Sequence, residues 1–329
     1  MTFMKTCLGA MAALAMGAVG AVAEPALIFD LGGKFDKSFN EAAFNGAKRW
    51  GDETGESYRE IELQSEAQRE QALRRFADGG SNPIVMTGFA FASAVENVAP
   101  DFPDTKFVII DMVVDQPNVR SVVFAEHQGS YLVGKMAAMA SESGTVGFIG
   151  GMDIPLIRKF ACGFVQGVKS VTPDATVIQN MTGTTPAAWN DPVKGAELTR
   201  AQVSQGADVV YHAAGGTGVG VLQAAADEGI LGIGVDSNQN YLHPGSVLTS
   251  MLKRVDVAVY NAFAAGPDVE TGIHVLDLSN DGVGVAVDEH NQALVSDEMM
   301  AAVEDAKAKI ISGDVAVHDY MSNNECPVK

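Results

Sequence analysis

The sequence has few cysteines, few basic residues and no short motif for metal binding or nucleophilic catalysis. Its 329 residues include three cysteines, two tryptophans and 22 Lys or Arg side chains, against 41 Asp or Glu. This balance argues against a nucleic-acid partner, because phosphate-backbone binding depends on clustered basic residues. The chain also lacks a C-x-x-C pair, an H-x-x-x-H helix and a G-x-S-x-G elbow. We therefore expect no metal site, no cofactor and no enzyme.

A long apolar run occurs only at the start of the chain. Lys5 precedes an apolar stretch over residues 8–22, which ends in Ala21-Val22-Ala23. A charged start, an apolar core and an A-x-A site are typical of a secretory signal peptide, the alternative being an N-terminal anchor. We predict that residues 1–23 are a signal peptide cleaved after Ala23, and that the mature protein is periplasmic and soluble. Cys7 lies ahead of the apolar core, so we expect no lipobox.

The predicted mature chain is strongly acidic and retains two cysteines. Removing residues 1–23 takes away Lys5 and no acidic residue, which leaves 41 acidic against 21 basic side chains and a formal charge of −20. Such acidity favours solubility. In an oxidising compartment Cys162 and Cys326 either pair, tying the C-terminal tail to a helix, or remain a buried thiol and a tail thiol.

Apolar runs that stop at Gly or Asp alternate with helical stretches along almost the whole chain. Strands are predicted at 26–30, 57–62, 83–87, 106–110, 119–124, 145–149, 175–180, 208–212, 231–235, 246–251, 272–276 and 283–287. Helices are predicted at 38–51, 66–78, 92–99, 127–141, 155–171, 190–205, 218–228, 254–264 and 297–311. This alternation indicates βαβ units and parallel sheets. The pattern restarts near residue 145, and the chain exceeds the usual single-core size, so we predict two α/β lobes.

Glycines and carboxylates at the ends of the predicted strands indicate a binding site. Six of the apolar runs end at Asp30, Thr87-Gly88, Asp111, Gly150-Gly151, Gly215-Gly216 and Asp236. Ligands bind beyond the carboxyl ends of the strands in open parallel sheets. Glycine there lets the backbone lie close to a ligand, and a carboxylate there needs polar partners.

One predicted helix start carries residues suited to a planar ligand. Ser38-Phe39-Asn40-Glu41 fits a capping box, with Ser38 as N-cap and Glu41 at N3. In one interpretation, Phe39 stacks on a planar ligand and Asn40 forms a hydrogen bond with it. In the other, Phe39 packs the helix against its loop and Asn40 is solvated. Ile157 and Phe160 belong to a helical stripe that we assign to core packing.

Four segments, in order, resemble the signatures of one family. Residues 30–40 resemble the opening D-x-G-G-x-x-D-K-S-F-N motif of the basic membrane protein family of ABC-transporter substrate-binding proteins, which includes bacterial purine nucleoside receptors. Residues 147–155, 213–218 and 250–256 resemble its second, third and fourth signatures. The resemblance extends across nearly the whole mature chain.

The resemblance implies a type I periplasmic-binding-protein fold, in which two doubly wound parallel-sheet lobes are joined by a multi-strand hinge and bind a solute between them. Lobe 1 is then expected to comprise residues 24–125 and 252–282, and lobe 2 residues 126–251 and 283–329. It also implies an extracytoplasmic, monomeric protein that is not an enzyme. Such a protein delivers its solute to an ABC permease driven by an ATPase.

Positions that match the family motifs imply a set of ligand-binding residues. Asp30, Phe39 and Asn40 match the first ligand-contacting segment, and Asp111 matches an acid expected near the base. The resemblance further implies a loop that lies close to the ligand, which matches Gly215 and Gly216. It also implies an acid and a lysine that bind ribose, which match Asp236 and Lys253.

The aromatic partners of the ligand stay open at this point. Trp189 is the candidate for a second stacking residue, because it lies in a loop between two prolines, although loop packing is the alternative. Tyr211 and His212 are further candidates, and Phe35 competes with Phe39.

The chemistry of these residues favours an uncharged, hydroxylated, aromatic solute. An ionised Asp accepts hydrogen bonds from vicinal hydroxyls, and Lys253 donates to them. A nucleotide would bring its charge towards Asp30 and Asp236, so we predict a purine nucleoside of the guanosine, adenosine or inosine class. The alternatives are a free purine base, another small polar solute, or a sensor that reports ligand to a membrane receptor. A nucleoside hydrolase is the nearest enzyme alternative, but no clustered aspartate motif supports it.

Overall fold

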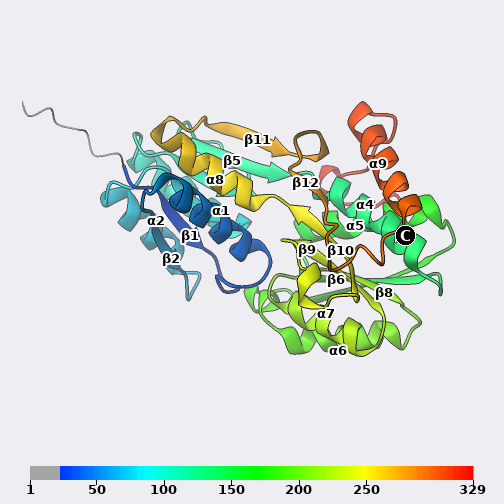
Figure 1. The fold of residues 1–329 in the computed structure, drawn as a ribbon. Coiled ribbons are helices and arrows are strands. Elements are labelled where there is room, and N and C mark those ends of the chain that lie inside the picture. Colours follow the sequence, from blue (N-terminus) through cyan, green and yellow to red (C-terminus); the bar gives the residue numbers. More distant parts are fainter. Residues whose placement is uncertain (1–22, 329) are drawn as a thin grey trace, which may run out of the picture.

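The computed structural model describes residues 23–328, so the predicted signal peptide lies almost entirely outside the described part of the chain. Two six-stranded sheets form two lobes (Figure 1). In lobe 1 the strand order is β11 (Gly272–Leu276), β5 (Val119–Phe124), β4 (Phe107–Ile110), β3 (Ile84–Thr87), β1 (Ala26–Phe29) and β2 (Arg59–Glu62). All of these strands pair in parallel.

The sheet of lobe 2 repeats this arrangement with one antiparallel edge. Its order is β12 (Val283–Val285), β10 (Val247–Lys253), β9 (Leu231–Asp236), β8 (Val209–Ala213), β6 (Thr145–Met152) and β7 (Thr176–Gly183). Only the pair formed by β10 and β12 is antiparallel among the described strands. The two parallel-dominated sheets confirm the predicted α/β fold class.

Helices cover both faces of the sheets, which explains why the central strands are apolar throughout. Lobe 1 holds α1 (Phe39–Thr54), α2 (Gln68–Asp78), α3 (Ala92–Val98) and α8 (Val255–Ala265). Along β1, Leu27 and Phe29 pack with the residues of α1 and α8, whereas Ala26 and Ile28 pack with those of α2 and α3. Side chains that alternate between two covered faces must all be apolar.

Lobe 2 is covered in the same way. Its helices are α4 (Glu126–Ala140), α5 (Pro155–Val171), α6 (Pro192–Val203), α7 (Thr217–Asp227) and α9 (Asp297–Ser312). No helix within residues 23–328 combines the length and the apolarity that a membrane crossing would need.

The chain passes between the two lobes at three places. These crossings follow β5, follow β10, and join β11 to β12. Residues 252 and 253, which we expected in lobe 1, pair within β10 of the second sheet. The division of the chain into lobes at the predicted residues otherwise stays a prediction.

The Gly150-Gly151 pair does not end a strand as predicted. Strand β6 continues through both glycines to Met152, and Gly150 pairs with Met181 of β7. A Cβ added at Gly151 would lie 2.1 Å from a ring carbon of Trp189. The glycine therefore extends the strand beneath a tryptophan, and its lack of a side chain serves packing rather than a turn.

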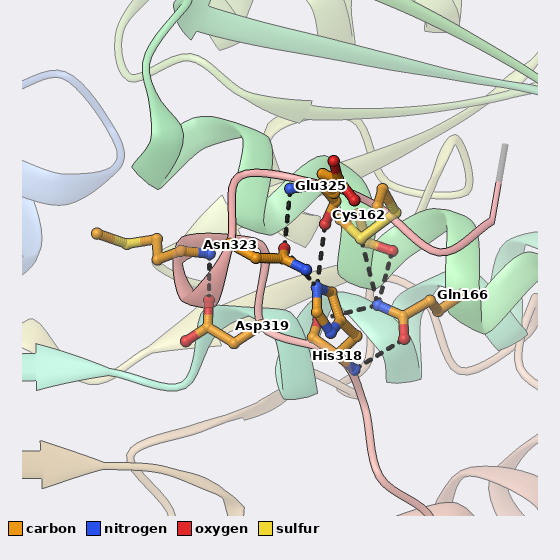
Figure 2. Close-up of a disulfide and its surroundings, with 8 residues drawn as sticks. Cys162, Gln166, His318, Asp319, Asn323 and Glu325 are labelled. Carbon is orange, nitrogen blue, oxygen red and sulfur yellow. Dashed lines mark hydrogen bonds between the residues drawn. A yellow bond between two sulfur atoms is a disulfide. The ribbon is translucent and has the colours of Figure 1, made fainter.

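A disulfide attaches the C-terminal tail to lobe 2. Cys162 of α5 is bonded to Cys326, with the Cα atoms 5.6 Å apart (Figure 2). Gln166, one turn further along α5, donates to the backbone oxygen of His318 at 3.0 Å and accepts from its N–H at 2.8 Å. One covalent bond and two hydrogen bonds to Gln166 thus help to hold the tail against α5.

Candidate ligand-binding site between the lobes

A cavity lies where the carboxyl ends of the strands of the two lobes face each other. Its volume is about 90 Å³, below the roughly 300–1,000 Å³ of typical small-molecule sites. Its walls are formed by Asp30, Leu31, Gly32, Asp36, Phe39, Asn40, Thr87, Gly88, Phe89, Asp111, Leu156, Ile157, Phe160, Trp189, Ala213, Gly215, Val235, Asp236 and Lys253.

The structure brings eight of the nine predicted ligand-binding residues to this cavity. The exception is Gly216, which lies at the N-cap of α7 instead of in the wall. A Cβ at Gly216 would lie 3.2 Å from the backbone oxygen of Trp189, so this glycine makes room for the tryptophan loop. That the wall residues contact a ligand stays a prediction.

Ser38 is the N-cap residue of α1 as predicted, but its side chain makes no capping hydrogen bond, so the predicted capping box is wrong. The carboxylate of Asp36 takes that part instead. It accepts from the N–H groups of Ser38 at 2.8 Å, Asn40 at 3.0 Å and Glu41 at 3.1 Å. A carboxylate suits this position because the N-terminal end of a helix is positively polarised. Burial nevertheless raises the pKa of Asp36 to about 7, against the opposing effect of the three N–H groups.

The Ser38 hydroxyl is therefore free to cross to the other lobe. It donates to Oδ2 of Asp236 at 2.5 Å. Two further hydrogen bonds join the same segments. Ser237 Oγ donates to the backbone oxygen of Ser38 at 2.9 Å, and Gln239 Nε2 donates to the backbone oxygen of Lys37 at 3.0 Å. These three bonds connect the loop before α1 in lobe 1 to the end of β9 in lobe 2.

Asn40 is not solvated, and its side chain is hydrogen-bonded within the protein. Its amide donates to the backbone oxygen of Gly33 at 3.2 Å, and its Oδ1 accepts from the Thr87 hydroxyl at 2.9 Å. With 3% of its surface exposed, Asn40 fastens the loop after β1 to the end of β3. It lines the cavity, but its polar atoms already have protein partners.

Asp30 forms an ion pair that the sequence analysis missed. Arg69 of α2 donates to Oδ1 of Asp30 from Nε at 3.1 Å and from Nη2 at 3.0 Å. Burial raises the pKa of Asp30, and the guanidinium acts in the opposite direction. No local signal could have identified Arg69, because the two residues are 39 positions apart.

The opposite end of the cavity holds a buried lysine among acids. Lys253 Nζ lies 2.7 Å from Oδ2 of Asp111 and 3.0 Å from Oε1 of Glu126. Burial by itself opposes the charge on Lys253, but the neighbouring acids outweigh it and raise the pKa of this lysine. Burial raises the pKa of Asp111 to about 6 despite Lys253, and it also raises the pKa of Asp236.

Asp111 and Asp236 share an uncommon backbone conformation. Their φ angles are 73° and 63°, in the left-handed region that glycine usually occupies. Such strain is concentrated at functional sites, and here it turns both carboxylates into the space beyond their strands.

The structure also separates the aromatic candidates. Phe39 and Trp189 line the cavity. Phe35 is 61% exposed and packs edge-on against Phe44, with ring centroids 5.4 Å apart. Tyr211 is fully buried among core aromatics of lobe 2.

His212 is likewise enclosed by protein, with Nε2 3.0 Å from Oε1 of Gln239. Burial lowers the pKa of His212 to about 4. This histidine therefore belongs to the core of lobe 2, and it is absent from the wall of the cavity.

Three further side chains of the wall were missed or assigned differently. Phe160 and Ile157, which we assigned to core packing, both line the cavity, so that assignment is wrong in part. Phe160 lies 5.5 Å from Lys253 Nζ, measured to the ring centroid. Phe89 directly follows the predicted strand end at Thr87-Gly88, and that glycine was the signal that could have identified it.

Comparison with known proteins places this geometry in a family. The Bmp family, described as ABC transporter substrate-binding protein PnrA-like, matches residues 24–320. The ABC transporter nucleoside-binding protein BmpA of Lactococcus lactis subsp. cremoris is 32% identical over 318 residues, covering 89% of this chain and 88% of its own. Basic membrane protein A2 of Borrelia garinii subsp. bavariensis is 29% identical over 294 residues, covering 86% and 84%.

A solved structure agrees with these relatives. An ABC transporter system solute-binding protein from Aeropyrum pernix K1 superposes with a TM-score of 0.81 at 29% identity, covering 92% of this chain and 95% of its own. The protein therefore belongs to the Bmp family of ABC-transporter substrate-binding proteins, an extracytoplasmic solute-binding family and not a family of enzymes.

Proposed function

We propose that this protein binds a purine nucleoside in the cavity between its lobes and delivers it to an ABC permease in the membrane. The observation that supports this most directly is the composition of the cavity wall. Phe39, Phe89 and Trp189 supply aromatic surface, while Asp236 and Lys253 supply charged hydrogen-bonding groups. A nucleoside has the matching parts, an aromatic base and a hydroxylated sugar.

The sugar would bind at the charged end. Besides its bond from Ser38, Asp236 retains acceptor capacity for ribose hydroxyls. An ammonium group has three N–H donors, so Lys253 can still donate to a solute besides its hydrogen bond to Asp111 and its ion pair with Glu126. Hydrogen bonds to charged groups contribute about 1.5–3 kcal/mol each.

The base would bind against the aromatic side chains. Stacking adds roughly 0.5–1.5 kcal/mol beyond the area that it buries. Trp189 fits into space left by glycines. A Cβ at Gly32 would lie 3.4 Å from the Trp189 Cβ, and a Cβ at Gly151 would collide with its ring. Glycines from both lobes thus surround this tryptophan, which fits a role in enclosing a flat ligand.

The charges of the wall favour a nucleoside over a nucleotide. A phosphate monoester carries about −1.5 to −2 at neutral pH, and Asp111, Asp236 and Glu126 surround the ammonium group of Lys253. Arg69 is already paired with Asp30 and offers little to a phosphate.

The location and the working motion follow from the same proposal. We infer that the protein acts in the periplasm after removal of residues 1–23. A solute that contacts both lobes stabilises the closed arrangement, which the permease then recognises. The loop before α1 and the end of β9 already exchange three hydrogen bonds in this arrangement.

Calorimetry with inosine, adenosine and guanosine tests the proposal. We expect a dissociation constant of about 1 μM or below for at least one of them. AMP should bind at least tenfold more weakly than adenosine, and adenine should lack the contribution of the ribose. Binding of AMP tighter than adenosine, or of adenine as tight as adenosine, would contradict the proposal. Native mass spectrometry of the gently purified protein gives an independent readout of any solute that it carries.

A further inference from the structure

A second buried lysine lies behind the cavity and takes no part in its wall. Lys159 of α5 is 6% exposed. Its ammonium group donates to the backbone oxygen of Phe124 at 2.6 Å and lies 2.8 Å from Oε2 of Glu126. Asp319 of the C-terminal tail is the third partner, with Oδ2 at 3.5 Å. A buried lysine with three oxygen partners is an ordered structural element rather than a loose surface charge.

Glu126 is shared between this lysine and the lysine of the cavity. It is the first residue of α4 and is 1% exposed. Its Oε1 lies 3.0 Å from Lys253 Nζ, while its Oε2 faces Lys159. Burial alone would raise the pKa of Glu126, but the two ammonium groups outweigh burial and hold this pKa at about 2. The group is therefore a carboxylate placed between two cations.

We propose that Glu126 and Lys159 are positioning residues that hold the Lys253 ammonium group with one N–H directed into the cavity. The proposal rests on the proposed function, in which Lys253 contacts the solute. Lys253 donates to Oδ2 of Asp111, and Oε1 of Glu126 lies 3.0 Å from its ammonium group as an ion-pair partner. Because Lys159 holds Oε2, Glu126 does not turn its second oxygen to Lys253. An N–H donor of Lys253 therefore remains for a solute hydroxyl.

The position of these residues in the fold supports such a role. Glu126 follows the crossing after β5, Lys253 precedes the crossing after β10, and Lys159 donates to the last residue of β5. The three side chains therefore lie at the hinge, where closure of the lobes moves atoms least. Their arrangement can exist before the solute arrives, which lowers the cost of ordering Lys253 on binding.

The tail completes the arrangement. Cys162 is three residues beyond Lys159 on α5, and its disulfide holds the segment that carries Asp319 (Figure 2). His127, also near Asp319, has Nδ1 at 4.0 Å from the carboxylate. Burial lowers the pKa of His127 to about 4, so it adds no charge at neutral pH.

Four proteins test the proposal: the wild type, Glu126→Gln, Lys159→Met and the double variant, each titrated with inosine. Each single variant should bind inosine about tenfold more weakly. Glu126→Gln leaves two unbalanced lysines, and Lys159→Met lets Glu126 turn both oxygens to Lys253. The double variant should bind more tightly than either single variant, because it restores the charge balance. Losses that simply add, or that stay within twofold of the wild type, would overturn the proposal.

A readout without nucleoside separates this proposal from the proposed function. The ¹⁵N ammonium signal of Lys253, identified by its absence in Lys253→Met, should appear in the wild type and in Lys159→Met. It should disappear in Glu126→Gln, because an ammonium group that has lost a counter-charge reorients and exchanges faster with water. If the wild type shows this pattern but binds no nucleoside, the proposed function is wrong and the positioning role stands. If the signal persists in Glu126→Gln, the positioning role is wrong.

Matched controls guard against general effects. The exposed pair Lys194 and Glu197, 3.4 Å apart on α6, receives the same two substitutions, and inosine affinity should not change. Should Glu126→Gln fail to fold, Lys159→Met alone decides: it must lose inosine affinity while the Lys253 signal is retained. Loss of that signal in Lys159→Met, or unchanged affinity, would contradict the proposal.

Discussion

The two ends of the cavity hold their buried acids in different ways. At the start of α1, Asp36 is held by three backbone N–H groups, and burial raises its pKa to about 7. At the hinge, Glu126 begins α4 in a similar position, yet two ammonium groups keep its pKa at about 2. Backbone dipoles thus offset burial only partly, and the single cation Lys253 does no more for Asp111, whereas two cations reverse the effect of burial on the pKa of Glu126.

This difference suggests that the two ends of the site behave differently when the lobes open and close. The hinge end is a framework of full charges that lies where the lobes join, so we expect it to remain in place as the lobes open. At the α1 end, Ser38 donates to Asp236 and Gln239 donates to the backbone oxygen of Lys37 across the lobes. We expect these bonds to break when the lobes open. A solute that touches both ends would couple the fixed charges to the moving loop.

The largest effect is expected from Lys253→Met. The substitution leaves Asp111 and Glu126 without their shared cation in a buried position. Breaking a buried ion pair costs about 3–5 kcal/mol, so urea denaturation should show a loss of stability of this order. Nucleoside binding should weaken at least a hundredfold by calorimetry. The matched control is Lys309→Met on the exposed surface of α9, where the loss should stay within about 1 kcal/mol.

Asp236→Ala should have the next largest effect, and it tests which part of the solute lies at the hinge. Removing one or two charge-assisted hydrogen bonds should weaken adenosine binding roughly 10- to 100-fold. Adenine has no ribose, so its affinity should stay within a factor of about two of the wild type. Equal losses for adenosine and adenine would show that Asp236 acts on the whole site rather than on the sugar.

Ser38→Ala should have a smaller effect and act through closure. The substitution removes the hydroxyl that donates to Asp236 from the other lobe. A hydrogen bond to a charged group contributes about 1.5–3 kcal/mol, and because Asp236 keeps its contact with the solute, we expect the lower end, a roughly tenfold loss of affinity. Small-angle scattering should then show a more open protein before ligand is added. Ser237→Ala, which removes a bond to a neutral carbonyl, should do less; an effect larger than that of Ser38→Ala would contradict this ranking.

Much of the fold was predictable because its signals are local. Apolar runs bounded by Gly or Asp identified the strands, and the carboxylates that follow them identified Asp30, Asp111 and Asp236 as cavity residues. The same signal gave a wrong strand end at Gly150-Gly151, where the strand continues and the glycines leave room for side chains packed against it. A glycine signals that a side chain would not fit, and the reason differs from place to place.

The partners of the predicted residues were not predictable in the same way. Arg69 reaches Asp30 from α2, and Glu126 lies 127 positions before Lys253. Such pairs depend on how helices pack and on where the chain crosses between lobes, which no local pattern records. Phe160 shows the related ambiguity, since one residue of an apolar helix stripe can complete the core or line a cavity.

The smallest effect on affinity is expected from Asp36→Asn, since the amide oxygen of an asparagine can still accept from the N–H groups of Ser38 and Glu41, although its NH2 group cannot accept from that of Asn40. The change should appear instead in the pH dependence of stability. The pKa of Asp36 is about 7 in the folded protein, against an ordinary value of 3.8. Between these two values the folded state holds a proton that the unfolded state has lost, so this contribution to the free energy of unfolding is present at low pH and disappears as pH rises through about 7. Urea denaturation from pH 4 to pH 8 should therefore show a steeper decline for the wild type than for Asp36→Asn. Equal slopes would mean that the N–H groups at the helix start keep Asp36 ionised as firmly as the two lysines keep Glu126.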